Sequence, residues 1–205
     1  MRNVFYKLII FAAVLTAFLW SCQSKTQNEL QSIETELALE RNAEVSREIK
    51  NQTTDFTLQA NSSYSYLSPT VFFYESRSFL PFWSDTGKPS KYTLSFLNFL
   101  DTCEYTGLVK EDFSVQEIRE LWKALQKDSN AKTQFKKWSR LDVLLTNAFF
   151  NACNDLKRGR LYSDSIHWKN DTSMFRRFFV PMTDSFALTA NCNNFFNSMQ
   201  PQWTE

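Results

Sequence analysis

The sequence predicts a mainly α-helical fold, with a compact helical domain of about five helices that follows an N-terminal signal segment and a polar linker. Apolar residues recur at helical spacing in several separate segments. Only three glycines occur in 205 residues, fewer than the turns of a β-sandwich or β-barrel usually require. Aromatic residues make up 16% of the chain, so we expect a core rich in aromatic rings.

The charge balance argues against one class of function. Lysine and arginine together number 23 and the acidic residues 22, which gives a formal net charge of +1. A nucleic-acid-binding protein would need a basic face, so we expect no nucleic-acid partner. The length suits one globular domain with short appendages.

The segment from Trp138 to Trp168 predicts the central helix of the domain. Its apolar residues follow the pattern of a helix with one broad buried face: Leu141, Leu144, Leu145, Ala148, Phe149, Ala152, Cys153 and Leu156. The opposite face is polar and carries Asp142, Thr146, Asn147, Asn151 and Asn154. Lys157 and Arg158 stand in the last turn, where the helix dipole favours cations, and Gly159 follows as the terminating residue.

Two helices are predicted in the first part of the domain, before residue 108. The first spans residues 69–78, with Ser68 as its N-cap and Pro69 at the first helical position. An extended aromatic segment, Pro81 to Trp83, leaves this helix, and residues 85–89 predict a turn. The second helix starts with Ser90 as its cap and is closed by Gly107; its expected buried residues are Leu94, Phe96, Leu97, Phe99 and Leu100.

Two more helices flank the central one. A capping box, Ser114 with Glu117, marks the start of a helix that should bury Ile118, Leu121, Trp122 and Leu125. A last helix is predicted over residues 184–199, where Pro201 stops it; its expected buried residues are Phe186, Ala190, Phe195 and Phe196.

Residues 1–21 are typical of a secretion signal. Arg2 and Lys7 give a positive start, and the apolar run from Leu8 to Leu19 is too short to span a bilayer stably. The run leads into Leu-Trp-Ser-Cys, which is similar to a lipobox, where bacterial signal peptidase II cleaves before a lipid-modified cysteine. We therefore expect lipidation of Cys22, which would hold the domain at a membrane of the cell envelope, on the periplasmic side. An uncleaved anchor or an ordinary signal peptide is the alternative.

Residues 22–66 are expected to be a tether. Within it, Leu30, Ile33 and Leu37, continued by Val45 and Ile49, suggest a short amphipathic helix. Residues 51–65 are polar, low in charge and without a period, which is typical of a loop. The domain proper is then expected over residues 67–205.

Several spaced motifs carry a family resemblance. The first is F-Y-E-S-R-S-F-L-P-F-W, from Phe73 to Trp83, and the second is C-E-Y-T-G-L-V-K-E-D-F, from Cys103 to Phe113. The third, D-V-L-L-T-N-A-F-F, starts at Asp142 and is followed by D-L, G-R-L and a Trp. In this order they resemble the scaffold domain of the large murein L,D-transpeptidases, enzymes that cross-link peptidoglycan in the bacterial periplasm. The resemblance covers residues 68–205.

The sequence contains no recognisable catalytic constellation. The family's enzymes use a cysteine thiolate activated by a histidine, in an S-H-G-C-x-R-like motif preceded by an H-x-x-G-like segment, and neither occurs here. The one histidine, His167, stands beside Trp168 and is expected to be structural. No group of His, Cys and carboxylate residues has the spacing of metal ligands, so we expect no metal, no cofactor and no catalytic residue in this chain.

The three remaining cysteines, Cys103, Cys153 and Cys192, lie on or beside apolar helical segments. A free cysteine in such a place behaves as a small buried hydrophobic residue. A single disulfide among them stays open as an alternative, because an extracytoplasmic compartment permits it.

A binding surface is conceivable around the basic and aromatic motif residues. Arg77 and Trp83 would stack on a sugar or bind a carboxylate, and Arg158 and Arg160 would meet anionic peptidoglycan stems or a partner domain. The interpretation we prefer places Trp83 and the other aromatic residues of the first motif in the core and pairs the arginines with nearby acids.

The resemblance implies a non-catalytic scaffold module of a murein L,D-transpeptidase-like envelope lipoprotein, associated with peptidoglycan cross-linking. Two alternatives stay open. Residues 197–205 resemble the family's linker into its later regions, so the chain would be a fragment of an active L,D-transpeptidase whose Cys-nucleophile domain lies after residue 205. The other alternative is a stand-alone lipoprotein that binds peptidoglycan or an envelope partner.

Overall fold

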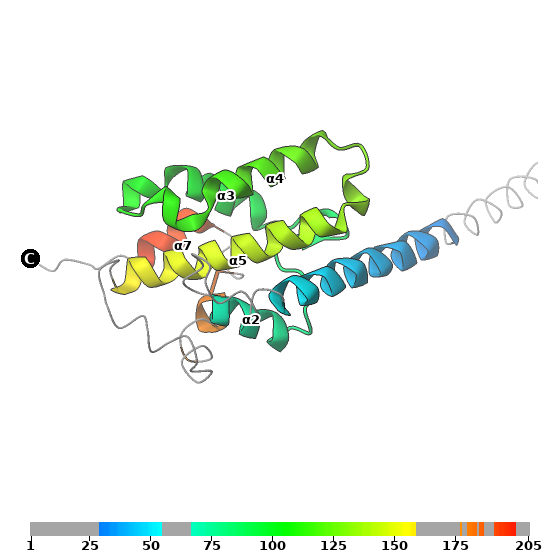
Figure 1. Ribbon diagram of the computed structural model, residues 1–205, viewed down its shortest axis with the longest axis horizontal. Helices are drawn as coiled ribbons and strands as arrows, with labels where there is room; N and C mark the ends of the chain where they lie inside the picture. Colours follow the sequence, from blue (N-terminus) through cyan, green and yellow to red (C-terminus); the bar gives the residue numbers. More distant parts are fainter. Residues whose placement is uncertain are drawn as a thin grey trace, which may run out of the picture. The chain divides into compact units, whose positions relative to one another are not determined.

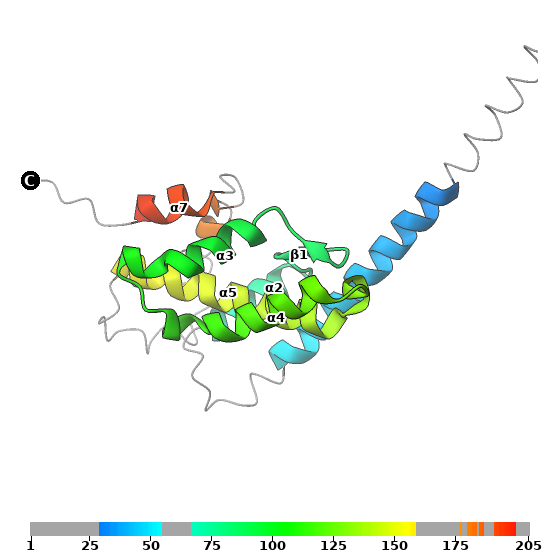
Figure 2. The same cartoon turned by 90° about the horizontal axis from the view of Figure 1, so that it is seen from above.

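A computed structural model describes residues 29–54, 67–158, 177, 180–183, 185–186 and 191–199 of the chain. The helix α5 (Phe135–Arg158) runs through the middle of the domain, with α4 (Val115–Lys127) along one side and α2 (Leu67–Ser76) along the other (Figure 1). The helix α7 (Cys192–Met199) packs against both α5 and α3 (Thr93–Thr102), and it lies beside α3 in Figure 2. The prediction of a mainly α-helical, compact domain is confirmed.

The central helix is more deeply enclosed than its sequence pattern indicated. Its apolar face is buried as predicted, but every residue from Leu141 to Phe150 is buried, including the polar ones. The polar residues that we assigned to an opposite face are 1–7% exposed: Asp142, Thr146, Asn147, Asn151 and Asn154. The reason is that α2, α4 and α7 pack around α5 from several directions and cover its polar side as well.

The core between these helices is aromatic, as predicted. The Trp83 and Phe96 rings stack with their centroids 4.9 Å apart, and Phe149 lies 5.0 Å from Phe186 and 5.6 Å from Phe195. Interlocked rings of this kind bury large apolar areas and fix the angles between the helices that carry them.

A short hairpin joins α2 to α3. Its strand β1 (Ser84–Asp85) pairs antiparallel with β2 (Lys88–Pro89). Thr86 and Gly87 make the two-residue turn, and both have positive φ angles, 53° and 74°, as the tight turns of hairpins require. A Cβ atom on Gly87 would stand 2.6 Å from the backbone of Lys132, so only glycine fits there. The predicted turn over residues 85–89 is confirmed.

Three predicted helix starts differ from the structure. The helix α2 begins at Leu67, so Ser68 and Pro69 lie within it and are not its N-cap and first residue. The helix α3 begins at Thr93 rather than after Ser90, and Leu94, expected to be buried, is 53% exposed. At the start of α4, Ser114 has a φ of 51° and its side chain makes no capping hydrogen bond. Glu117 instead accepts a hydrogen bond of 2.8 Å from Nε of Arg140 on α5, so the capping box was a wrong prediction.

The last predicted helix is shorter than expected. The helix α7 begins at Cys192, and it buries Phe195 and Phe196 as predicted. Residues 180–183 are also helical, and Phe186 is fully buried, whereas Asp184 and Ala190 lie outside the described residues. Two turns of helix are enough to bring both phenylalanines of α7 onto α3 and α5.

The chain separates into two compact units, Met1–Glu40 and Arg41–Glu205. One continuous helix covers residues 29–54, and its second half belongs to the larger unit. There, Val45 and Ile49 are buried in the core, and Gln52 donates a hydrogen bond of 2.6 Å from Nε2 to Oγ of Ser139. The domain therefore extends further toward the N-terminus than residue 67, because a segment that we assigned to the tether supplies part of its core.

The smaller unit is described only from residue 29. Its helical residues Leu30, Ile33 and Leu37 are 59%, 52% and 41% exposed. The predicted signal segment over residues 1–21 and Cys22 lie outside the described residues. Among the helices that the structure describes, none combines the length and the apolar character needed to cross a membrane.

Candidate functional site

The most distinctive polar chemistry of the domain lies inside it, around the carboxylate of Asp142. This side chain is 1% exposed, yet it is surrounded by donors. Its Oδ1 accepts hydrogen bonds from the Tyr74 hydroxyl at 2.7 Å and from the backbone N–H of Phe82 at 2.9 Å. Its Oδ2 accepts from the Ser84 hydroxyl at 2.9 Å and from the Trp83 N–H at 3.1 Å. These contacts satisfy a carboxylate that burial alone would strongly disfavour.

Thr146 extends these contacts into a chain of hydrogen bonds. Nε1 of Trp83 donates to Oγ1 of Thr146 at 2.9 Å, and Oγ1 lies 2.7 Å from the Tyr74 hydroxyl. Because the single Tyr74 proton goes to Asp142, the Thr146 hydroxyl must donate to the Tyr74 oxygen. The order is therefore Trp83, Thr146, Tyr74 and Asp142, and each donor polarises the next. We call these four residues, together with Ser84, the Asp142 cluster.

Three separate elements bring the Asp142 cluster together. Asp142 and Thr146 are four residues apart on α5, so they share one face of the helix. Tyr74 comes from α2, Trp83 from the segment just before the hairpin, and Ser84 from its first strand, β1. The carbonyl of Trp83 in turn accepts a hydrogen bond from the Thr93 hydroxyl at the start of α3. The cluster thus ties α2, α3 and the hairpin to the central helix.

The environment of the cluster suits a structural role. Burial raises the pKa of the Asp142 carboxyl, although the hydrogen bonds from Phe82, Tyr74, Trp83 and Ser84 oppose this shift. Burial and the neighbouring carboxylate raise the pKa of the Tyr74 phenol well above its ordinary value. Both residues are fully enclosed, so neither presents an acid or a base to a substrate.

The three cysteines of the domain are free and buried, as predicted, so the alternative of a disulfide among them does not hold in this structure. Burial raises the pKa of the Cys103 thiol and raises that of Cys153 well above its ordinary value. It raises the pKa of Cys192 to about 12. A thiol with a raised pKa stays protonated near neutral pH, and the protonated form is not the nucleophile. Among the described residues, no group of His, Cys, Asp and Glu could hold a metal ion.

The structure does not bring the residues of the conceivable binding surface together. Trp83 is 1% exposed and belongs to the core, which is the interpretation that we preferred. Arg77 is half-buried, with its guanidinium 5.1 Å from the ring centroids of both Phe73 and Phe82. The side chain of Arg158 and the whole of Arg160 lie outside the described residues.

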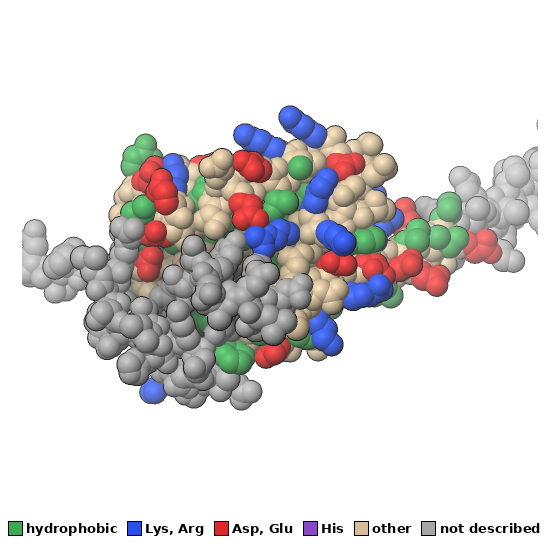
Figure 3. All heavy atoms as spheres, in the orientation of Figure 1, with side chains coloured by type: hydrophobic (Ala, Val, Ile, Leu, Met, Phe, Trp, Pro, Cys, Tyr) green, Lys and Arg blue, Asp and Glu red, His purple; other side chains and the backbone are tan. Residues whose placement is uncertain are grey.

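Charged side chains of both signs mingle on the face of the molecule seen in Figure 3. Ion pairs among the described residues include Lys137 with Asp128 at 3.7 Å and Arg140 with Glu117 at 2.8 Å.

The role of Asp142 differs from the prediction: the residue was expected on a polar, exposed face, but its side chain is 1% exposed and hydrogen-bonded within the core. The sequence does contain one indication of the cluster. Asp142 and Thr146 are four residues apart and so share a helix face, and the upstream motif supplies Tyr74 and Trp83 as hydrogen-bond donors. All of these residues stand in the motifs that carry the family resemblance.

A family model described as Scaffold domain matches residues 70–205, which is more than half of the chain. The chain belongs to the Scaffold domain family. This finding confirms the resemblance to the L,D-transpeptidase scaffold domain and identifies the chain as a scaffold module. No curated protein and no solved structure matched the chain.

The matched region of this Scaffold domain contains the whole Asp142 cluster. The helical residues 41–54, which pack onto the same core, precede the matched region.

Proposed function

We propose that this Scaffold domain is the non-catalytic module of an L,D-transpeptidase-like envelope lipoprotein and that it works in peptidoglycan cross-linking. Its part would be to brace a catalytic transpeptidase domain, or to hold that domain near the cell wall. A lipid on Cys22 would keep the chain at a membrane of the cell envelope, facing the periplasm.

This proposal rests on where the motif residues of the family lie in the fold. Tyr74, Trp83 and Asp142 stand in the motifs of the family, and all three are buried and hydrogen-bonded within one cluster. Motif residues of an enzyme would be expected to face a substrate, whereas these residues lock helices to one another. A rigid body is what a bracing module needs, because it must keep a partner domain at a fixed place.

The lipid anchor is tested by metabolic labelling of the full chain with an alkyne-bearing fatty acid in a bacterial host. The wild-type chain should incorporate the label and sediment with membranes. The Cys22→Ala variant should lose both properties, whereas Cys103→Ser, which changes a buried thiol, should keep the label. An unlabelled wild-type chain would contradict the lipoprotein part of the proposal.

The link to peptidoglycan is tested in the native host and in vitro. Deleting the gene should lower the share of 3→3 cross-links among the released muropeptides, and a copy of the gene should restore it. The purified chain should also sediment with isolated peptidoglycan sacculi. Unchanged cross-links in the deletion strain, together with no sedimentation, would rule out a role in the cell wall.

A further inference from the structure

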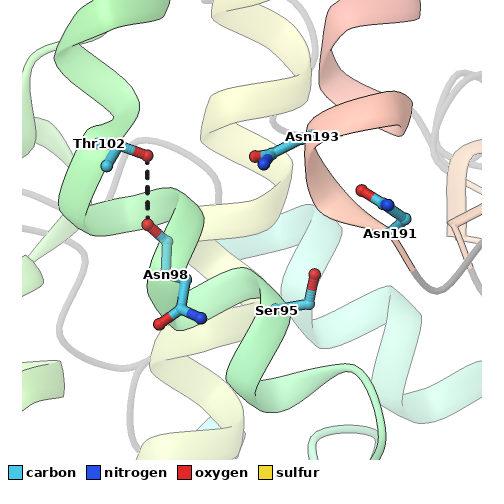
Figure 4. Close-up of a pocket in the computed structure, with 5 residues that line it drawn as sticks. All are labelled: Ser95, Asn98, Thr102, Asn191 and Asn193. Carbon is cyan, nitrogen blue, oxygen red and sulfur yellow. Dashed lines mark hydrogen bonds between the residues drawn. The ribbon is translucent and has the colours of Figure 1, made fainter.

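A polar groove lies between α3 and α7, on the outside of the domain (Figure 4). Its volume is about 370 Å³, and the described residues that line it have uncharged hydrogen-bonding side chains: Ser95, Asn98, Thr102, Asn191 and Asn193. The first three come from α3, at spacings of three and four residues that place them on one face of the helix. No residue of the Asp142 cluster is among the described residues that line this groove.

The two walls of the groove are fixed by the core beneath them. The rings of Phe99 on α3 and Phe196 on α7 stack with their centroids 4.0 Å apart. Above them, Oγ of Ser95 accepts a hydrogen bond of 3.1 Å from the backbone N–H of Cys192. Oδ1 of Asn191 accepts one of 3.2 Å from the N–H of Asn194. The groove is therefore a preformed feature and needs no rearrangement before it meets a ligand.

Two side chains of the groove are available to a ligand. The amides of Asn98 and Asn193 are exposed, and within the described part of the chain neither forms a hydrogen bond. In Figure 4 they extend from opposite walls, Asn98 from α3 and Asn193 from α7. Each amide offers a carbonyl acceptor and an NH₂ donor, so the pair can exchange hydrogen bonds with hydroxyl or amide groups of a ligand.

An exposed aromatic residue follows the groove side chains of α3 in sequence. The helix α3 continues directly into the 3₁₀ turn Cys103–Thr106, which carries Tyr105 with 92% of its surface exposed. Tyr105 follows Thr102 by three residues and thus continues the helical spacing of the groove side chains. From Ser95 to Tyr105 the wall is about 15 Å long, which suits an oligomer rather than a single small molecule. A fully exposed tyrosine presents a flat apolar face with a polar tip.

The charges closest in sequence to this wall are already paired. Oδ1 of Asp101 accepts a hydrogen bond of 2.8 Å from Nε of Arg119, and Glu104 pairs with Lys110 at 2.7 Å. The five described side chains that line the groove carry no charge. Within the described part of the chain, the lining therefore suits a neutral ligand and gives no counter-charge to a phosphate or a carboxylate.

We infer that this groove binds a neutral oligosaccharide that bears acetamido groups. The Asn98 and Asn193 amides would pair with sugar hydroxyl and acetamido groups, and the Tyr105 ring would pack on the C–H face of a pyranose. The inference deepens the proposed function, on which its link to the cell wall rests, because the glycan strands of peptidoglycan are polymers of acetamido sugars. It names a ligand class and a site for that function.

The test measures binding of chitotetraose, a tetramer of N-acetylglucosamine, to the full 205-residue chain in a detergent without sugar head groups. Isothermal titration should give saturable binding of chitotetraose and none of maltotetraose, which has the same length but no acetamido groups. Asn98→Ala and Asn193→Ala should each weaken binding about fivefold. Tyr105→Ala should weaken it about tenfold, and Tyr105→Phe should retain most of it.

Gln126→Ala provides a matched control, since Gln126 is an exposed amide near the end of α4 and does not line the groove. Its affinity for chitotetraose should equal that of the wild-type chain, and circular dichroism should show the same fold for all variants. No binding of chitotetraose by the folded wild-type chain, or equal losses in Gln126→Ala and in the groove variants, would overturn the inference.

A second arm separates this inference from the proposed function. Sedimentation with sacculi that is lost in Tyr105→Ala and Asn193→Ala supports both. If these variants sediment as well as the wild-type chain and chitotetraose does not bind, the groove inference falls while the role in the cell wall stands. If chitotetraose binds but neither sacculi nor peptide-free glycan strands are retained, the groove inference stands for another acetamido glycan, and the proposed link to peptidoglycan falls.

Discussion

The carboxylate of Asp142 joins three segments of the chain that are up to 68 residues apart in sequence. It accepts hydrogen bonds from a side chain of α2, from two backbone N–H groups of the segment before the hairpin, and from Ser84. Removing an acceptor from buried donors costs about 1–3 kcal/mol for each group left without a partner. Several donors depend on this one acceptor, so a single substitution tests the whole arrangement.

We predict that Asp142→Ala lowers the free energy of unfolding by about 3–5 kcal/mol, because it leaves the Tyr74 hydroxyl and the backbone N–H donors buried without an acceptor. Asp142→Asn should cost less, since one oxygen remains as an acceptor. Urea denaturation measures both changes. Asp101→Asn serves as the control: this residue is in an exposed ion pair with Arg119, and its loss should cost about 1 kcal/mol or less. Equal small losses at both positions would show that the cluster does not stabilise the fold.

The free energy of unfolding should depend on pH through the titration of the Asp142 carboxyl. Burial raises the folded-state pKa of Asp142 above its ordinary value of 3.8, so the folded chain holds a proton that the unfolded chain has released. The contribution of Asp142 to the free energy of unfolding is therefore full below pH 3.8 and falls as the pH rises through the raised folded value. Subtracting the pH profile of Asp142→Asn from that of the wild-type chain isolates this change. A contribution that rises with pH would mean that the hydrogen bonds outweigh burial.

Phe149 tests the apolar side of α5. It is 1% exposed and contacts the rings of Phe186 and Phe195. We expect Phe149→Ala to lower the free energy of unfolding by about 3–5 kcal/mol, through lost burial and the cavity that remains. Leu94→Ala, at an exposed position of α3, should change it by about 0.5 kcal/mol or less. Thermal and urea unfolding of the two variants give the comparison, and a small loss at Phe149 would show that this face of α5 is not packed as described.

At the scale of helices and strands, the sequence predicted what its local patterns determine. The apolar period located α4 and α5, and the sequence around Gly87 located the hairpin turn, since positive φ angles there require particular residues. The same patterns failed where the partner of a side chain is distant in sequence. Glu117 matched a local capping box, yet it pairs with Arg140 on another helix.

The candidate site was beyond prediction for the same physical reason. A polar residue on a helix is expected to be exposed only where water is a better hydrogen-bond partner than any group of the protein. For Asp142 the better partners come from α2 and from the segment before the hairpin, and no period within α5 reveals them. The family motifs include Tyr74, Trp83, Asp142 and Thr146, but a motif does not say which of its members face one another.

The helix over residues 29–54 offers a test at the scale of an element. Ile49 is fully buried in its second half, whereas Leu39, in the first half, is 68% exposed. We predict that Ile49→Ala lowers the free energy of unfolding of the full chain by about 2–5 kcal/mol, because the domain core includes this residue. Leu39→Ala should leave it nearly unchanged. Equal, small effects would mean that residues 41–54 are a tether after all and that the domain starts near residue 67.

At the scale of the whole molecule, the packing of the domain decides what its cysteines can do. Cys103, Cys153 and Cys192 come from three different helical segments, and all three are fully buried. The aromatic core encloses them, and burial raises their pKa values. The enzymes that the family resemblance points to need an exposed thiolate, so reactivity of these thiols separates a bracing module from an acyl-transfer enzyme.

We therefore predict that the folded chain forms no adduct with a carbapenem, which acylates catalytic cysteines of L,D-transpeptidases, and that iodoacetamide leaves the three thiols unmodified. Intact-protein mass spectrometry of the Cys22→Ala chain, which keeps only these three cysteines, should show an unchanged mass after incubation near neutral pH. In denaturing urea, iodoacetamide should modify all three cysteines, which proves that they are present as thiols and that folding alone protects them. Fast alkylation of the folded chain would show that the core opens readily. A carbapenem adduct on any one cysteine would instead point to a reactive site and would replace the scaffold role with catalysis.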